Sequence, residues 1–211
     1  KTGTLVTKIL LQDGRATGVA TAKGQTYTAR YIVANTDPYQ LSYKLIGKEN
    51  LPAAYIEKLE SLKPANSLFG VYLGLNIDLA ALGYKDTEIF YNTHLDSVKN
   101  YDAMMKGDYA NGAVAMTLYT NLGDPVYAPA GKSVVKLDAY ADIGFWPEDR
   151  AAYLKLKQQK VDELISLAAK VIPELADPKN IEVKEGYTPR TIERYTLNKG
   201  GVVYGFNLTP D

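Results

Sequence analysis

Apolar residues gather in short runs along much of the chain, and some of these runs alternate loosely with polar residues at the period of two that is typical of half-buried β-strands. Three such runs near the start lie at residues 4–11, 16–22 and 25–29. They are separated by Asp13-Gly14 and Lys23-Gly24, and Gly-containing dipeptides of this kind favour tight turns. The pattern therefore predicts a three-stranded β-meander.

A fourth apolar run, Tyr31-Ile-Val-Ala34, predicts a short buried strand that stops at Asn35-Thr-Asp-Pro38. Asp37 can cap a following helix and Pro38 suits its first position. We expect that helix to end at Gly47, because glycine accepts the left-handed conformation common after helices. A second helix is predicted over residues 51–62 from the spacing of its apolar side chains.

The rest of the chain mixes strands with fewer helices. Strands are predicted over residues 67–76, 87–92, 113–120, 133–141 and 180–184, and a helix over 95–105. The longest helix is predicted to begin at Pro147-Glu-Asp149, with acids in its first turn. Its apolar stripe consists of Tyr153, Leu156, Val161, Leu164, Ala168, Val171 and Leu175. The two glycines within 67–76, Gly70 and Gly74, indicate close approach by another backbone or a ligand.

Strands that follow one another without an intervening helix point to the α+β class. We expect an antiparallel or mixed sheet covered on one side by helices. A complete doubly wound domain is not expected. No Gly-x-Gly-x-x-Gly stands between a strand and a helix, so the cradle for a dinucleotide's pyrophosphate is missing.

Composition removes several classes of function. The 211 residues are 46% hydrophobic, enough for a sizeable core. Lysine plus arginine and aspartate plus glutamate each number 24, so nothing indicates nucleic-acid binding. With no cysteine and a single histidine, His94, we expect neither a metal site nor a Ser-His-Asp triad. No apolar run approaches the ~20 residues that span a bilayer. The 17 tyrosines suit strand packing or the lining of an elongated apolar pocket.

Two segments resemble a known family. One reads Gly186-Tyr-Thr-Pro-Arg-Thr-Ile-Glu-Arg-Tyr195 and continues to Gly200-Gly-Val-Val-Tyr-Gly205, and the other is Tyr31-Ile-Val-Ala-Asn-Thr-Asp-Pro38. Both are similar to segments of FAD-dependent oxidoreductases of the phytoene desaturase, carotenoid isomerase and retinol saturase family.

The resemblance implies a division of the chain. Residues 1–37 resemble part of a FAD-binding domain, with a β-meander and a strand. Residues 38–186 resemble the substrate domain, and residues 187–211 resemble the segment that returns to the FAD domain. We therefore expect the chain to be an internal segment of a longer two-domain flavoprotein.

The resemblance also implies cofactor-binding positions, which are Val6, Ala34, Asn35, Thr188, Pro189, Arg190 and Gly205. Val6 matches a position where backbone groups hold the adenine edge, and Asn35 lies in the turn that passes near the dinucleotide. Structural alternatives stay open: an ordinary strand valine at Val6, turn and cap chemistry at Asn35, a domain-junction ion pair at Arg190 and a hairpin turn near Gly205. No catalytic residue is identified.

The implied activity is desaturation, saturation or isomerisation of double bonds in a hydrophobic, isoprenoid- or carotenoid-like substrate by a FAD enzyme. FAD is expected in the full-length protein, and the isolated segment is expected to bind none and to be inactive. An amine oxidase-like flavoenzyme and a non-catalytic ligand-binding or interaction module remain alternatives.

The expected partners follow from the same resemblance. We expect a hydrophobic small-molecule substrate and no nucleic acid, in a protein that is cytoplasmic or peripherally attached to a membrane. Self-association is left open, through the side that would face the FAD domain. The candidates for that contact are Tyr195, Val203, Tyr204 and Phe206.

Overall fold

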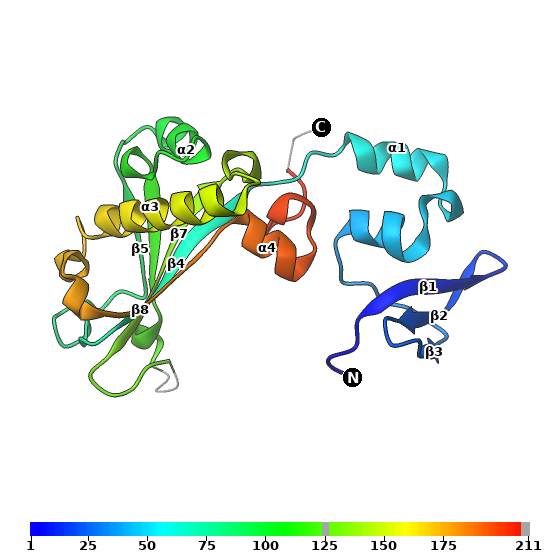
Figure 1. Cartoon of the computed structure of the whole chain (residues 1–211), viewed down its shortest axis with the longest axis horizontal. Helices are drawn as coiled ribbons and strands as arrows, with labels where there is room; N and C mark the ends of the chain where they lie inside the picture. Colours follow the sequence, from blue (N-terminus) through cyan, green and yellow to red (C-terminus); the bar gives the residue numbers. More distant parts are fainter. Residues whose placement is uncertain (124–126, 208–211) are drawn as a thin grey trace. The chain divides into compact units, whose positions relative to one another are not determined.

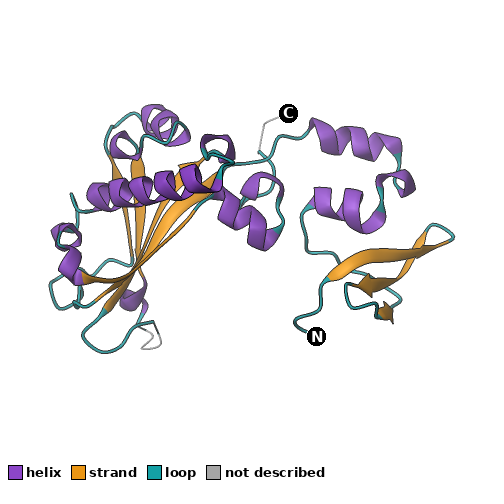
Figure 2. Cartoon of the chain, viewed as in Figure 1, coloured by secondary structure: helices purple, strands orange, loops and turns teal. Residues whose placement is uncertain are grey.

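The computed structural model describes residues 1–123 and 127–207 and shows an α+β protein with two compact units (Figures 1 and 2). Unit 1 comprises Lys1–Ala65 and Glu193–Asp211, and unit 2 comprises Asn66–Ile192. Every strand pairing in the two sheets is antiparallel. The predicted fold class is confirmed. The assignment of segments to a FAD domain and a substrate domain stays a prediction.

Unit 1 begins with the predicted meander. Its strands are β1 (Val6–Gln12), β2 (Arg15–Thr21) and β3 (Thr26–Thr28), in the order β1-β2-β3. The first turn places Asp13 and Gly14 at φ values of 51° and 73°. Both are left-handed conformations, which Asp and Gly tolerate better than most residues.

The strand predicted over Tyr31–Ala34 is wrong. This segment has no strand assignment, and its Tyr31 and Val33 side chains are 84% and 92% exposed. A strand exists only where a neighbouring strand takes up its backbone hydrogen bonds. In the described part of the chain no strand pairs with this segment. The apolar run therefore does not form a strand.

The two helices predicted in unit 1 are present. The first is π-helical over Gln40–Ile46, and the second is α1 (Ala53–Ser61). Asp37 accepts a hydrogen bond from the Gln40 backbone N–H at 2.9 Å, and Gly47 follows the first helix at φ 88°. The cap and the helix end therefore lie where the sequence indicated.

The C-terminal segment pairs through its backbone with the residues that follow α1. Ala65 donates to the carbonyl of Gly205 at 2.9 Å, and Asn207 donates to that of Lys63 at 2.9 Å. Pro64 and Phe206 form an isolated antiparallel bridge between these bonds. Residues far apart in the sequence thus make one structural unit.

Unit 2 is built on a five-stranded sheet of order β5-β6-β7-β4-β8. Its strands are β4 (Ser67–Leu75), β5 (Glu88–Asn92), β6 (Ala113–Leu118), β7 (Ser133–Ala141) and β8 (Ile181–Tyr187). Along β7, alternate residues from Ser133 to Ala141 are buried, while those between them are half-buried or exposed. One face of the sheet is therefore a core surface.

Helices cover that core surface. They are α2 (Ser97–Met105) and α3 (Arg150–Ala168), and α3 contacts β4, β6, β7 and β8 (Figure 1). Phe69 lies at the centre, with ring centroids 4.7 Å from Tyr109 and 5.1 Å from Trp146. Short 3-10 turns complete the chain at Lys48–Asn50, Tyr109–Asn111, Tyr119–Leu122, Ile143–Phe145, Pro173–Ala176, Pro178–Asn180 and Lys199–Gly201.

Helix α3 differs from the prediction at both ends. Glu148 and Asp149 precede it rather than occupy its first turn, and Asp149 caps it by accepting from the Ala152 N–H at 2.8 Å. The helix ends at Ala168 although the apolar stripe continues. Pro173 disfavours helical backbone in the residue before it, and Ile172 lies at φ −119° and ψ 83°.

A helix that the sequence did not predict, α4 (Pro189–Thr196), follows β8 directly. Its start is stabilised by two threonines: the Thr188 N–H donates to Thr191 Oγ1 at 3.2 Å, and the Thr191 N–H donates to Thr188 Oγ1 at 3.4 Å. Eight residues are too few for the apolar period to show a helix, so capping was the available signal.

Glycines mark close contacts, as predicted for Gly70 and Gly74 in β4. A Cβ on Gly74 would lie 3.1 Å from the Val183 side chain of β8. A close helix–sheet contact lies at Gly186 of β8, where a Cβ would lie 2.5 Å from Val161 Cγ2 of α3. The lack of a side chain at Gly186 lets α3 lie directly against the sheet edge.

Replacing Leu164 with alanine should lower the free energy of unfolding by about 2–5 kcal/mol, because its side chain is fully buried between α3 and the sheet. Leu154→Ala on the same helix is the matched control, since Leu154 is 47% exposed. Denaturant melts of both variants measure the difference. Equal losses in the two variants would contradict the packing described.

Gly186→Val should also destabilise the protein, by about 1–3 kcal/mol, because overpacking against Val161 outweighs the better strand propensity of valine. Adding Val161→Ala should restore part of the loss, since it removes the atoms that the new side chain meets. A double-mutant cycle measures this coupling. Strictly additive effects would show that the two positions do not touch.

Candidate functional site

The motif from Gly186 to Tyr195 forms the end of β8 and all but the last residue of α4. Thr188 is fully buried, and its hydroxyl lies 2.9 Å from the Tyr153 hydroxyl of α3. Arg190 donates from Nε at 3.2 Å and from Nη2 at 2.8 Å to the backbone carbonyl of Trp146. The motif thus anchors the first turn of α4 to the core of unit 2.

Of the expected cofactor positions, Thr188, Pro189 and Arg190 belong to unit 2. Thr188 and Pro189 are buried, and the polar side-chain atoms of Thr188 and Arg190 already have protein partners. Their contact with FAD stays a prediction. The internal contacts show that the threonine and the arginine also have a structural task.

The other four expected positions belong to unit 1. Val6 is half-buried at the start of β1 and pairs with Thr21, whereas Ala34 and Asn35 are exposed in the extended segment before the first helix. Gly205 is exposed at φ 81°, with open space where a Cβ would lie. Backbone and small side chains here could approach a planar cofactor, but the sequence provides no glycine-rich cradle for its phosphates. These residues fit a FAD only in part.

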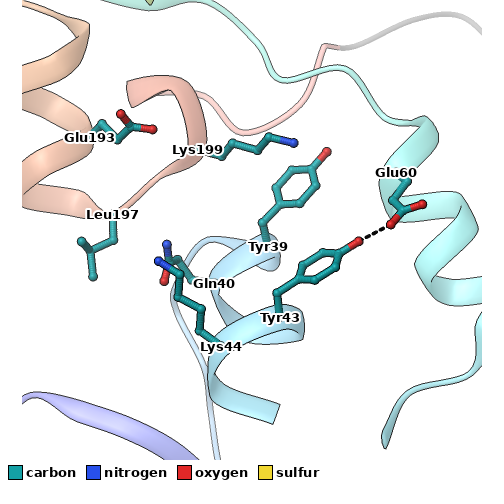
Figure 3. A pocket seen from close by; sticks show the side chains of 8 residues that line it. All are labelled: Tyr39, Gln40, Tyr43, Lys44, Glu60, Glu193, Leu197 and Lys199. Atoms are coloured by element: carbon teal, nitrogen blue, oxygen red, sulfur yellow. Dashed lines mark hydrogen bonds between the residues drawn. The ribbon is translucent and has the colours of Figure 1, made fainter. Parts of the chain in front are cut away.

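A cavity of about 500 Å³ lies in unit 1 (Figure 3). It is lined by Tyr39, Gln40, Tyr43, Lys44, Glu60, Glu193, Leu197 and Lys199. Tyr39 and Tyr43 are one helical turn apart, and their rings stack with centroids 6.3 Å apart. Lys199 Nζ lies 4.0 Å from the centre of the Tyr39 ring, a favourable cation–π distance.

Hydrogen bonds fix the two tyrosines of this cavity. Tyr39 donates to the carbonyls of Leu59 and Leu62 at 3.1 and 3.2 Å, and Tyr43 donates to the Glu60 carboxylate (Figure 3). The bond to Glu60 raises the pKa of Tyr43 to about 12. The cavity has aromatic walls and a rim of lysines and glutamates, which suits an amphipathic ligand.

A second candidate region is the face of the five-stranded sheet opposite the core, called the polar face below. Strand register places two rows of side chains across it. One row is Glu88, Thr117, Lys136, Tyr72 and Glu185, and the other is Phe90, Ala115, Asp138, Gly70 and Tyr187. Aromatic and small residues thus surround one lysine and one aspartate.

Lys136 and Asp138 form an ion pair at the centre of the polar face, with Nζ 2.8 Å from Oδ2. Burial raises the pKa of Asp138, although the hydrogen bond and charge of Lys136 oppose this. Burial alone would lower the pKa of Lys136, but the bond and charge of Asp138 outweigh it and the pKa is raised. Such a pair among aromatic rings is a candidate for ligand contact or proton transfer.

The surroundings of His94 are structural. The buried Asn100 side chain accepts from the His94 backbone N–H at 3.1 Å and donates to the His94 carbonyl at 2.7 Å. A cavity of about 260 Å³ adjoins this turn. In the described residues no group of three or more His, Cys, Asp or Glu is arranged to hold a metal ion.

Sequence reasoning missed both the cavity and the polar face. The cavity combines residues about 150 positions apart, which no local pattern connects. The polar face did leave a signal, because Lys136 and Asp138 are two residues apart in an alternating strand and must share a face.

Comparisons with known proteins give sequence relatives along nearly the whole chain. Prolycopene isomerases 1 and 2, chloroplastic, of an Oncidium hybrid cultivar are each 27% identical over 95% of this chain and 32% of their own length. The 4,4'-diapolycopene oxygenase of Methylomonas sp is 26% identical over 95% of this chain and 38% of its own length. The chain therefore spans about a third of the length of these curated relatives.

No protein-family model matches the chain. Among solved structures, an oxidoreductase from Methanosarcina mazei is 16% identical, covers 88% of this chain and 37% of its own, and has a TM-score of 0.48. The described residues contain no helix long and apolar enough to cross a membrane. The sequence relatives confirm the resemblance stated from the two motifs: the chain is similar, over almost its whole length, to the carotenoid desaturase and isomerase-like family.

Proposed function

We propose that the chain is the substrate-binding part of a FAD-dependent oxidoreductase acting on the double bonds of a hydrophobic, isoprenoid- or carotenoid-like molecule. The observation that carries the proposal is the likeness of 95% of the chain to proteins named prolycopene isomerase and diapolycopene oxygenase. One name refers to an isomerase and the other to an oxygenase. We take the substrate class from both names, and we propose desaturation, saturation or isomerisation as the reaction.

The polar face supports this role for unit 2. Phe90 and Tyr72 are 69% and 43% exposed on it, and the small side chain of Ala115 lies directly beside Phe90. Exposed aromatic rings next to small residues are the surface that an elongated apolar ligand requires. The core on the opposite face keeps the sheet rigid beneath such a ligand.

FAD, when bound, would supply the redox chemistry by exchanging hydride with the substrate. The residues of this chain that fit contact with it are the exposed Ala34, Asn35 and Gly205 of unit 1. Their part is to let backbone approach the cofactor and to exclude water beside it. The glycine-rich cradle would come from a part of the protein outside this sequence.

Peripheral membrane association and self-association are further proposals. Tyr195 and Tyr204 of unit 1 are 78% and 72% exposed, and exposed apolar surface of this kind supports an interface. Val203 and Phe206 contribute less, because both are half-buried. The Phe206 ring packs edge-on against Tyr39, with centroids 5.9 Å apart.

Purified chain 1–211 should lack stoichiometric flavin absorbance, whereas a longer protein that contains it should be yellow. The physical reason is that the phosphate-binding loop supplies most of the anchoring for the charged centre of the cofactor. Visible absorbance spectra measure both, with circular dichroism as the control for folding. Stoichiometric flavin in the short chain, or none in the longer protein, would contradict the proposal.

The activity is tested by expressing the longer protein in a bacterial host that accumulates poly-cis and partly saturated carotenoids. We expect new geometric isomers or a changed number of conjugated double bonds, separated by chromatography and identified by their spectra. A flavin-free variant with the glycine-rich loop replaced is the control. An unchanged carotenoid profile, together with oxidation of amines in the same extract, would favour an amine oxidase-like enzyme.

A further inference from the structure

The cavity beside Tyr39 has no role in the proposed function. Its volume of about 500 Å³ lies within the range of about 300–1,000 Å³ that is usual for small-molecule sites. The first helix and the residue before it form one wall, and residues 193–199 contribute a second (Figure 3). All the lining residues belong to unit 1, so the cavity lies within a single unit.

Two tyrosine rings give the cavity a flat apolar wall. Tyr39 and Tyr43 lie nearly parallel, with their ring planes 17° apart. The Tyr39 hydroxyl is bonded to the Leu59 and Leu62 carbonyls, and the Tyr43 hydroxyl to Glu60. These bonds hold both rings in place. A fixed aromatic wall favours a ligand that has a flat ring of its own.

Two lysines reach the cavity without an acceptor for their ammonium groups. Among the described residues, Lys44 Nζ has no hydrogen bond or ion pair. The contact of Lys199 Nζ is with the Tyr39 ring, 4.0 Å from its centre. An ammonium group has three N–H donors and bonds most strongly to a negatively charged oxygen. The cavity therefore has unused donors for an anionic group.

The two carboxylates at the cavity are bonded within the protein. Glu60 accepts from the Tyr43 hydroxyl, and Glu193 Oε1 accepts from the Gly200 N–H at 2.9 Å. A cationic ligand would find Lys199 already over the Tyr39 ring, which is the position that attracts a cation most strongly. Lys44 would repel it as well. The arrangement thus favours an anion over a cation.

Leu197 lines the cavity in a strained backbone conformation. Its φ is 62°, a left-handed value that glycine adopts freely and leucine does not. Its N–H donates to the Glu193 carbonyl at 2.8 Å and closes the end of α4, where glycine is the common residue. Strained non-glycine residues cluster at functional sites. We infer that the leucine side chain is needed as an apolar part of the cavity wall.

We propose that this cavity binds an aromatic acid, meaning a flat ring system that carries one acidic group. The ring lies against Tyr39 and Tyr43 with Leu197 at its edge, and the acidic group accepts hydrogen bonds from Lys44 and Lys199. This ligand is distinct from the hydrophobic substrate and from the FAD of the proposed function. The two proposals therefore stand or fall separately.

The test is a fluorescence titration of chain 1–211 with anilinonaphthalene sulfonate, an aromatic acid whose emission rises when it is bound. Its matched control is phenylnaphthylamine, the same ring system without the sulfonate. We expect one sulfonate probe per chain, bound roughly 5-fold or more tightly than the neutral analogue, because charge-assisted hydrogen bonds add to the ring contact. Equal affinities, or no binding of the sulfonate probe, would overturn the proposal.

Three lysine variants locate the site. Lys44→Met and Lys199→Met each remove one ammonium group, and each should weaken binding of the sulfonate probe about 3-fold or more without weakening that of the neutral analogue. Lys58→Met is the matched control, because Lys58 is an exposed lysine of α1 outside the cavity lining. Full affinity in both cavity variants, or equal weakening in all three, would exclude the cavity as the site.

Leu197→Gly separates binding from a structural role. Glycine relieves the left-handed backbone, so thermal unfolding without ligand should occur at the same temperature or higher. Affinity for the sulfonate probe should nevertheless fall about 2-fold or more, because an apolar contact is lost. Either a clear decrease in the unfolding temperature or an unchanged affinity would contradict the role given to Leu197.

Displacement of the bound probe identifies the charge that the cavity prefers. Naphthalene carboxylate should displace it at a concentration roughly 5-fold below that of naphthylmethylamine, because the unused donors belong to lysines. Stronger displacement by the amine would mean that Glu60 and Glu193 govern the cavity, and the inference would fail. Flavin in the longer protein is measured separately. Flavin without binding of the acid would refute this inference alone, and binding of the acid without flavin would refute only the proposed function.

Discussion

The structure of unit 2 depends on one constraint, the strict alternation of side chains along β4 and β7, the middle strands of the sheet. Leu137 and Val71 point to the same face, and α3 packs against that face with Leu164 fully buried. Because the period is two, every residue between these positions must point the other way. The burial of one face thus decides which residues, Asp138 among them, are available on the other.

The same constraint explains why charge is tolerated at the centre of the sheet. A lone carboxylate with only 16% of its side chain exposed would be costly. Lys136 lies two residues before Asp138 on the same strand, so the pair forms without any rearrangement of the backbone. The rings of Tyr72 and Tyr187 then add cation–π contacts to the lysine. Strand geometry alone brings the four groups together.

Local patterns in the sequence were enough to predict most of the fold. The meander, the strands of the large sheet and the burial of Leu164 follow from periodicity and turn residues. The prediction of a strand at Tyr31–Ala34 was wrong, because a strand forms only beside a pairing partner and the local pattern does not show whether one is present. Helix α4 was missed because its signal lies in the reciprocal threonine bonds at its start. Short elements defined by capping leave little hydrophobic pattern to detect.

The candidate sites were harder to predict, for a different reason. The motif around Thr188 and Arg190 was recognised by resemblance, and the structure adds their contacts to Tyr153 and Trp146. The cavity beside Tyr39 joins the first helix to Lys199, so it exists only after the chain has folded. Lys136 and Asp138 were visible as polar residues within a strand. Their neighbours Gly70 and Tyr187 come from other strands, and only the strand register places them beside the pair.

The outer position of β8 in the sheet has a consequence for how copies of the protein avoid one another. An edge strand exposes backbone groups that could pair with a second chain. Three charged residues of β8 are held by ion pairs within unit 2: Glu182 with Lys132, Lys184 with Asp162 and Glu185 with Lys157. A second strand that added here would have to displace or desolvate these charges. This edge is thereby protected against sheet-to-sheet aggregation while the strand remains free to lead into α4.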